Sequence, residues 1–396
     1  MEKRVSNDEY TKSIIKEILS SKTTIEKVNK FKIHKNKLNN CRIFLFDEEK
    51  SNFDSSFKNY EIGSFGVYGV GDYTKTWVID SEHIADKTYL KVGKTVNFDL
   101  NILTYLNKIM QGRKINIDEK EFIKYLNYLK VCQFQNGMMT AIMERVKTPM
   151  ELNIFVEMIT SFVKFDNMSL VDESCVDFYL YPDDYLKVKQ IYDSGLSQIG
   201  EANSQFNIIC CCVMKAFLLK NFGDNLTDEE KIEELIKYCL EILNCYLEKE
   251  IVLLSLYIAN DIRTNKTFKK LTNNSNVMKN ILNVSWDIYH IRLIEQIMQI
   301  DYKYKKEKDI IVLPYFATAD KGLIDAMKIN PVKAVVLFEN YSIVYHKLCI
   351  QDICKNMKII ENISSKVSIR AKKIDSVNFT KIRKQLEEEI KNNIKI

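Results

Sequence analysis

Apolar positions along the chain change their spacing at two points, which separates helical stretches from a strand-rich one. Within residues 12–35, Ile14 and Ile18 lie on one face of an amphipathic helical pattern. Residues 41–98 change to short runs of aromatic and β-branched residues with turn residues between them, a pattern that predicts strands. Helical spacing returns after residue 100 and continues for most of the chain.

The clearest helix start is Thr227, where Glu230 follows three residues later and completes a capping box. Apolar residues then repeat at helical spacing: Ile232, Leu235, Ile236, Cys239, Leu240, Leu243, Tyr246 and Leu247. The last stretch, 375–396, predicts a charged amphipathic helix.

Two later segments, 310–318 and 333–339, break the helical pattern with β-branched and aromatic runs of strand length. Roughly fifteen residues separate them, a distance that suits a βαβ crossover. We therefore expect the two segments to pair in parallel within one sheet.

Composition supports a mainly helical protein. The 396 residues include 11 glycines and 4 prolines, about a third of their average share, which disfavours a turn-rich sandwich or barrel. The length predicts two to three domains. A formal net charge of +5 permits a nucleic-acid partner without demanding one, because a local patch matters more than the total.

The ten cysteines show no CxxC pair and no cysteine–histidine zinc spacing, which indicates reduced thiols and a cytoplasmic protein. Cys210, Cys211 and Cys212 lie in an apolar stretch and are interpreted as buried small hydrophobic residues. No uninterrupted apolar run approaches the roughly 18 residues of a membrane span, so no membrane partner is expected.

Four of the glycines fall within residues 63–71. A loop that cradles a nucleotide phosphate is one interpretation, although no Gly-Lys-Ser/Thr follows at P-loop spacing. A twisted hairpin that needs positive φ is the favoured interpretation.

Three aspartates stand where predicted elements meet. Asp99 follows a strand-like run and begins a predicted helix with Asn101 in its first turn. Asp320 follows the strand 310–318 and precedes another helix, and Asp287 lies on the predicted helix that leads to that strand. Ligands of open parallel sheets bind beyond the carboxyl ends of the strands, so we expect Asp99 and Asp320 at one rim.

Carboxylates gathered at one rim repel each other unless a cation joins them. Mg²⁺ suits such an oxygen-only environment and binds through a few carboxylates together with substrate phosphates. With a phosphodiester present, the site would orient water and stabilise charge on the leaving oxygen. The alternative is that each aspartate is only a helix cap or a solvated surface charge.

Neighbouring polar residues also have two interpretations. His290, one turn from Asp287, either protonates a leaving group or is a hydrogen-bonded structural histidine. Arg292 either clamps a phosphate or forms a salt bridge to a neighbouring helix. Lys321, next to Asp320, is the better-placed phosphate contact.

The order of these residues resembles the PIN-like family of metal-dependent nucleases. The resemblance lies in DLN at the end of the first strand (Asp99, Asn101), WDIYHIR on a late helix (Asp287), and TADKGL after the next strand (Thr318, Asp320). TADKGL is its most specific part, and the match covers about 94–145 and 283–340, well under half of the chain.

The resemblance implies an α/β fold with a PIN-like parallel sheet flanked by helices, and Mg²⁺ or Mn²⁺ held by Asp99, Glu144, Asp287 and Asp320. Thr318 would position water or Asp320 by hydrogen bonding. The family's glutamate on an early helix has no unique counterpart here, and Glu144 is our choice with Glu151 and Glu157 as neighbours in sequence.

The implied activity is that of an endonuclease that hydrolyses phosphodiester bonds, in RNA rather than DNA. Single-stranded or structured RNA would be the partner, contacted by Lys321, Arg292 and Asn101. A toxin or defence role, a homo-oligomer, and a protein activator or inhibitor are expected from family habit alone.

The chain departs from the family by a long helical segment between Glu144 and Asp287. We therefore predict an N-terminal accessory region at 1–90 with some β structure, a discontinuous catalytic domain at 91–150 and 281–396, and a helical insertion at 151–280. The competing interpretation is a non-catalytic interaction protein in which the helical middle binds a partner and the PIN-like scaffold is degenerate.

Overall fold

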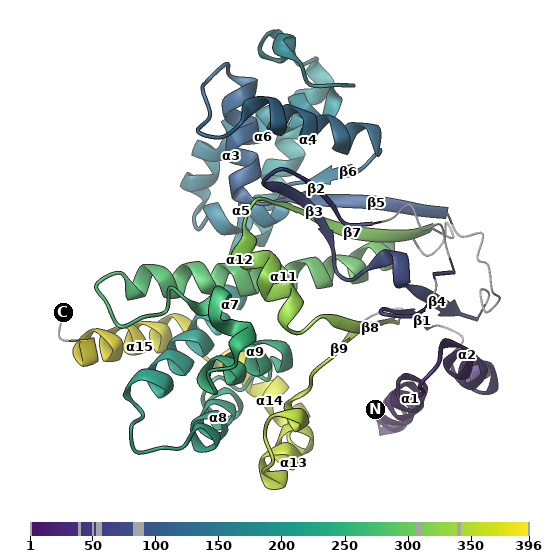
Figure 1. The fold of residues 1–396 in the computed structure, drawn as a ribbon, viewed down its shortest axis with the longest axis vertical. Coiled ribbons are helices and arrows are strands. Elements are labelled where there is room, and N and C mark those ends of the chain that lie inside the picture. The colour runs from purple at the N-terminus through teal and green to yellow at the C-terminus, as the bar shows by residue number, and fades with distance from the viewer. Residues whose placement is uncertain are drawn as a thin grey trace.

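The computed structural model describes residues 2–38, 41–49, 51–52, 58–81, 91–305, 310–338 and 342–394. Two sheets and many helices form a mixed α/β fold (Figure 1). The predicted α/β class, with strands early in the chain and helices through its middle, is confirmed, whereas the expected parallel sheet is replaced by sheets that contain antiparallel pairs.

The larger sheet has five strands in the order β2-β3-β7-β5-β6. Their bounds are β2 Tyr60–Ile62, β3 Phe65–Gly69, β5 Lys91–Phe98, β6 Gln135–Gly137 and β7 Ile310–Thr318. β5 is parallel to both β6 and β7, whereas β3 is antiparallel to β7 and to β2. The sheet is therefore mixed, with three neighbouring parallel strands whose carboxyl ends share one rim.

The smaller sheet has four antiparallel strands in the order β4-β1-β8-β9. Their bounds are β1 Arg42–Leu45, β4 Trp77–Asp80, β8 Val332–Leu337 and β9 Ser342–His346. The prediction that the segment 333–339 pairs in parallel with 310–318 is wrong. The antiparallel strand β3 occupies the edge of β7 where β8 was expected, and β8 pairs with β1 instead.

Helices make up most of the remaining described chain. They are α1 Glu2–Leu19, α2 Thr24–Ile33, α3 Leu100–Met110, α4 Glu119–Val131, α5 Met139–Arg145, α6 Pro149–Asn167, α7 Pro182–Phe222, α8 Asp228–Lys237, α9 Glu248–Ile258, α10 Asn265–Phe268, α11 Val277–Lys305, α12 Lys321–Ile329, α13 Met357–Ser365, α14 Val367–Lys373 and α15 Phe379–Ile394. The Thr227–Glu230 capping box begins α8 as predicted.

Helix α11 connects the two largest hydrophobic cores. Ile291 and Ile294 pack in the core around the five-stranded sheet, while Ile288 and Leu293 pack in the core of the helical body. Figure 1 shows α11 between that sheet and the helical body of α7, α8 and α9. A third, smaller core joins α1 and α2 to the four-stranded sheet.

The glycine-rich segment forms the β2–β3 hairpin, with Gly63 at φ 57° in its turn. The backbone N–H of Ser64 donates to Glu121, and that of Gly69 donates to Asn59. These N–H groups are therefore engaged by side chains and do not cradle a phosphate. The hairpin interpretation is confirmed.

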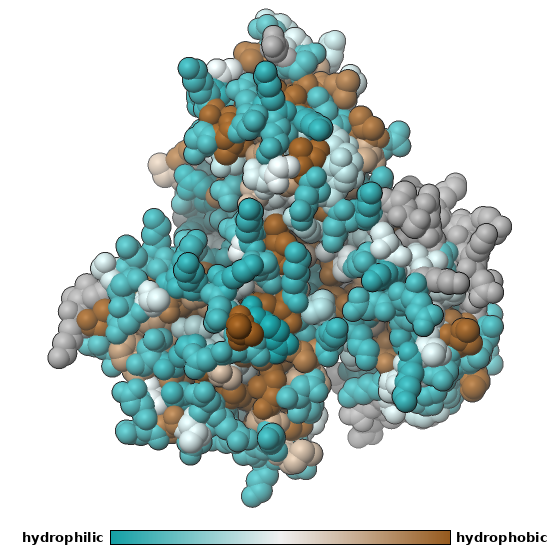
Figure 2. Space-filling view, in the orientation of Figure 1, coloured by the Kyte–Doolittle hydropathy of each residue, from teal (hydrophilic) through white to brown (hydrophobic). Residues whose placement is uncertain are grey.

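Helix α7 is the one helix of the described ranges whose length and composition fit a membrane span, and 72% of its apolar window is buried inside the protein. Cys210, Cys211 and Cys212 are buried there, and all ten cysteines are free. The face in Figure 2 is mostly hydrophilic, with apolar residues scattered over it.

Candidate active site at the carboxyl rim of the mixed sheet

Asp99 lies at the junction of β5 and α3. Its carboxylate caps α3 by accepting a hydrogen bond from the Ile102 N–H at 2.6 Å. The other carboxylate oxygen accepts the hydroxyl proton of Thr318, the last residue of the neighbouring strand β7. Asp99 is 4% exposed, so both of its oxygens are fixed by the local fold.

Asp320 has the matching position after β7, where it caps α12. Its carboxylate accepts from the N–H groups of Gly322 at 2.7 Å and Leu323 at 3.2 Å. Its own N–H donates to the hydroxyl oxygen of Thr318 at 2.9 Å. Thr318 therefore connects the ends of two adjacent parallel strands, as the parallel rim predicts.

Asp287 and His290 reach this rim from α11, and Glu144 reaches it from α5. The His290 Nε2 lies 3.5 Å from the Glu144 Oε2, although this nitrogen has no hydrogen-bond partner. His290 is 4% exposed, and Asp287 and Glu144 are half-buried. The structure thus brings the predicted glutamate to the predicted aspartates.

Burial and repulsion by neighbouring carboxylates raise the pKa values of Asp99, Glu144 and Asp287. Burial raises the pKa of Asp99 to about 6, opposed by the hydrogen bonds from Ile102 and Thr318 and reinforced by the charge of Asp320. Burial, followed by the charges of Asp99 and Asp320, raises the pKa of Glu144 to about 7.

Asp287 has a higher pKa than Asp99 and Glu144. Burial raises its pKa to about 8, with further contributions from the charges of Asp320 and Glu144 and an opposing one from Lys270. Burial also lowers the pKa of His290 to about 4, so its imidazole is neutral at pH 7. The four carboxyl groups therefore form one electrostatic unit, which we call the acidic cluster: Asp99, Glu144, Asp287 and Asp320.

Within the described part of the chain, no three carboxylate, imidazole or thiolate side chains are arranged to hold a metal ion. Asp99 and Asp320 each direct one oxygen at the start of their own helix. The residue types still fit a hard divalent cation, which prefers carboxylate oxygens, and the buried Nε2 of His290 faces them without a partner. Cation binding therefore requires side-chain rotation toward a common point.

The two other candidate glutamates lie outside the acidic cluster. The Glu151 carboxylate accepts from the Lys147 N–H, and the Glu151 N–H donates to Thr148, the N-cap of α6. Glu157 accepts hydrogen bonds from the side chains of Asn107 and Gln111. Tertiary packing therefore singles out Glu144 among the three glutamates.

One of the three predicted substrate contacts, Arg292, binds another residue of the protein instead. The Arg292 Nη1 donates to the Glu250 Oε1 at 3.0 Å, and Glu250 is 1% exposed. Arg292 thus balances a buried carboxylate on α9, and the salt-bridge interpretation is the correct one. Lys321 and Asn101 are exposed in the first turns of α12 and α3 beside the acidic cluster.

Sequence analysis missed Lys270, which is exposed and close enough to Asp287 to lower its pKa. It lies in an irregular segment before α11, and no motif or spacing connects it with the acids. Asp325, on α12, forms an ion pair with Lys266 at 3.7 Å, four residues before Lys270 in the sequence.

The chain matches no family model, no curated protein and no solved structure. The resemblance to PIN-like nucleases therefore stays a resemblance of a few residues.

Proposed function

We propose that the protein is a metal-dependent endonuclease of the PIN-like kind that hydrolyses RNA. One observation supports this most strongly: four acids from four separate segments meet at the rim of three parallel strands, where burial and the neighbouring charges raise the pKa values of Asp99, Glu144 and Asp287. Burying mutually repelling carboxylates costs stability, which is typical of a functional site.

Asp99, Glu144, Asp287 and Asp320 would hold Mg²⁺ or Mn²⁺. A divalent cation bound there supplies positive charge that stabilises the developing negative charge of phosphodiester hydrolysis and lowers the pKa of water. The chain's own groups orient the acids, since Thr318 fixes Asp99 and the backbone of Asp320.

The remaining residues surround this centre. The Nε2 of neutral His290 lies 3.5 Å from the Glu144 Oε2 and has no hydrogen-bond partner, so it is available to accept a proton from that carboxyl group. The exposed cations Lys321 and Lys270 contact substrate phosphates, a role that positions nucleic acid without reading its sequence. Asn101 adds an uncharged contact at the start of α3.

Cleavage of labelled single-stranded RNA with Mn²⁺ tests this proposal, comparing wild type with Asp320→Asn. Asparagine keeps the helix cap and removes the charge that a cation needs. We expect activity to fall by about a hundredfold or more. Asp325→Asn is the matched control, because Asp325 lies on the same helix, pairs with Lys266 and is outside the acidic cluster.

Equal cleavage by wild type and Asp320→Asn would overturn the assignment of the acidic cluster. Parallel assays on single-stranded DNA check the preference for RNA. The ten free thiols favour a reducing, cytoplasmic setting, while a toxin or defence role and regulation by a partner protein follow only from the resemblance.

A non-catalytic interaction protein is the second candidate, and one observation favours it: no three acids among the described residues are arranged as metal ligands. In that case the helical body would carry the function. Absence of Mn²⁺ binding by calorimetry, together with absence of cleavage, would support it.

A further inference from the structure

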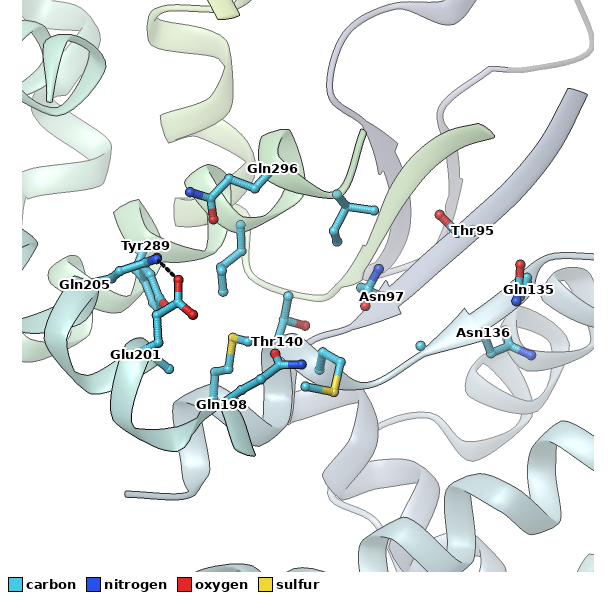
Figure 3. Close-up of a pocket in the computed structure, with 16 residues that line it drawn as sticks. Thr95, Asn97, Gln135, Asn136, Thr140, Gln198, Glu201, Gln205, Tyr289 and Gln296 are labelled. Carbon is cyan, nitrogen blue, oxygen red and sulfur yellow. Dashed lines mark hydrogen bonds between the residues drawn. The ribbon is translucent and has the colours of Figure 1, made fainter. Parts of the chain in front are cut away.

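A cavity of about 690 Å³ lies between the mixed sheet and the helices α5, α7 and α11. Figure 3 shows β5 and β6 on one side, α7 with Gln198 and Glu201 on the other, and Tyr289 and Gln296 of α11 closing a further wall. Its volume is in the ordinary range of small-molecule sites.

The lining of the cavity selects for an uncharged ligand. Carboxamides reach it from both sheet and helices, among them Asn97, Gln198 and Gln296, and Met143 and Tyr289 provide apolar wall. No lysine, arginine or histidine of the described chain lines it, and its one carboxylate, Glu201, accepts a hydrogen bond from Gln205. An anion finds no counter-charge there, whereas a neutral group with donors and acceptors finds partners.

Two carboxamides from adjacent strands give the cavity a polar wall. Asn97 is 7% exposed, and the buried Oδ1 of Asn136, which also lines the cavity, has no hydrogen-bond partner among the described residues. Leaving a buried polar group unsatisfied costs about 1–3 kcal/mol. A carboxamide offers a donor and an acceptor side by side, the pairing that amide side chains use to bind the edge of a base.

The cavity adjoins the acidic cluster through two elements. Asn97 and Asp99 are two residues apart on extended backbone, so their side chains leave the same face about 7 Å apart. On α5, Thr140 lines the cavity and Glu144 follows one turn later. A ligand in the cavity therefore lies next to the proposed reacting phosphate.

We propose that this cavity binds a nucleobase of the RNA beside the hydrolysed phosphodiester, which rests on the proposed function above. Asn97 and Gln296 hydrogen-bond the edge of the base, and Tyr289 with Met143 contacts its apolar faces. Recognition of splayed-out bases by polar edges and apolar faces is the usual mode for single-stranded RNA.

Binding of the four ribonucleosides in EDTA, followed by ligand-observed NMR, tests the cavity without any catalysis. We expect at least one nucleoside to bind wild type, and Asn97→Leu and Gln296→Leu each to weaken it about tenfold. Two variants on opposite walls guard against misfolding of one. Gln385→Leu, an exposed amide on α15, is the matched control and should bind as wild type does.

The proposal is overturned if no nucleoside binds up to about 10 mM, or if binding survives both cavity variants unchanged. The two proposals fail separately. Asp320→Asn should abolish RNA cleavage and leave nucleoside affinity intact. Nucleoside binding by a wild type that cleaves no RNA would remove the nuclease proposal and keep the cavity as a nucleoside site.

Discussion

Single residues at the carboxyl rim combine a structural and a chemical role. Asp99 and Asp320 are N-caps, as the plainest interpretation of their positions predicted, and they are also members of the acidic cluster. The two roles are compatible because a carboxylate that caps with one oxygen keeps lone pairs for other partners. Sequence position alone identified both residues, since the end of a strand and the start of a helix are local signals.

Asp287 offers a direct test of the electrostatics. Its pKa is raised to about 8 from an ordinary 3.8, so the folded state holds its proton more tightly than the unfolded state does. Stability contributed by this group is therefore present below pH 4 and lost as the pH rises toward 8. Asp287→Asn should raise the free energy of unfolding at pH 8 without cations by about 2 kcal/mol.

At pH 3 the same substitution should change stability little, because Asp287 is then protonated in both the folded and the unfolded protein. Urea unfolding at both pH values in EDTA measures the difference. Asp325→Asn, outside the acidic cluster, is the control. A stabilisation of equal size at pH 3 and pH 8 would contradict the repulsion argument.

Helix starts and turns could be predicted from the sequence because they depend on neighbouring residues. The pairing of strands could not be predicted in the same way. The capping box at Thr227 and the hairpin at Gly63 depend on a few adjacent residues. Strand β8 pairs with β1, which lies near the other end of the chain, and no local pattern in the sequence indicates that pairing. Strand β6 is only three residues long, too short for a periodic pattern to reveal it.

The choice of Glu144 illustrates the same limit. Glu144 was chosen with Glu151 and Glu157 close behind it in sequence, and helical spacing cannot rank these three glutamates. The packing of α5 against α11 brings Glu144 to His290, and that contact joins segments far apart in sequence. The sequence also left two roles for Arg292, a phosphate clamp and a salt bridge. The contact with Glu250, on another helix, decides between them.

Substituting alanine at two glycines, Gly200 and Gly63, should change the stability of the protein in opposite directions. Gly200 lies within α7, and an added Cβ there meets no atom within 4 Å. Gly200→Ala should therefore stabilise the protein by about 0.5–1 kcal/mol. Gly63 has positive φ and the Glu121 carboxylate against it, so Gly63→Ala should destabilise by about 1 kcal/mol or more.

Thermal unfolding of both variants beside wild type measures the two effects, with circular dichroism as the check on fold. A destabilised Gly200→Ala would mean that α7 bends or packs at that position. An unchanged Gly63→Ala would mean that the hairpin turn does not require its left-handed backbone.

At the scale of the whole molecule, proton release reports whether the acidic cluster binds a cation as a unit. Asp287 and Glu144 have pKa values of about 8 and 7, so both are partly protonated at pH 7, and cation binding must displace those protons. Titration of Mn²⁺ at pH 7 should release about one to two protons, with affinity rising from pH 6 to pH 8.

Calorimetry in two buffers of different ionisation enthalpy counts the protons. Asp287→Asn should release fewer than wild type and bind more weakly. Heats that are the same in both buffers would show that Mn²⁺ binds elsewhere or not at all.

The hydrogen bond from Thr318 to Asp99 joins residues 219 positions apart in the sequence. This separation determines when the site can form during synthesis of the chain. While the ribosome is still making α11, β5 has no β7 beside it, and the rim lacks Thr318 and Asp320. Every fragment that ends before β7 therefore lacks Asp320, one of the four acids of the acidic cluster, together with the Thr318 hydroxyl that holds Asp99. The proposed activity could therefore begin only after most of the chain has been translated.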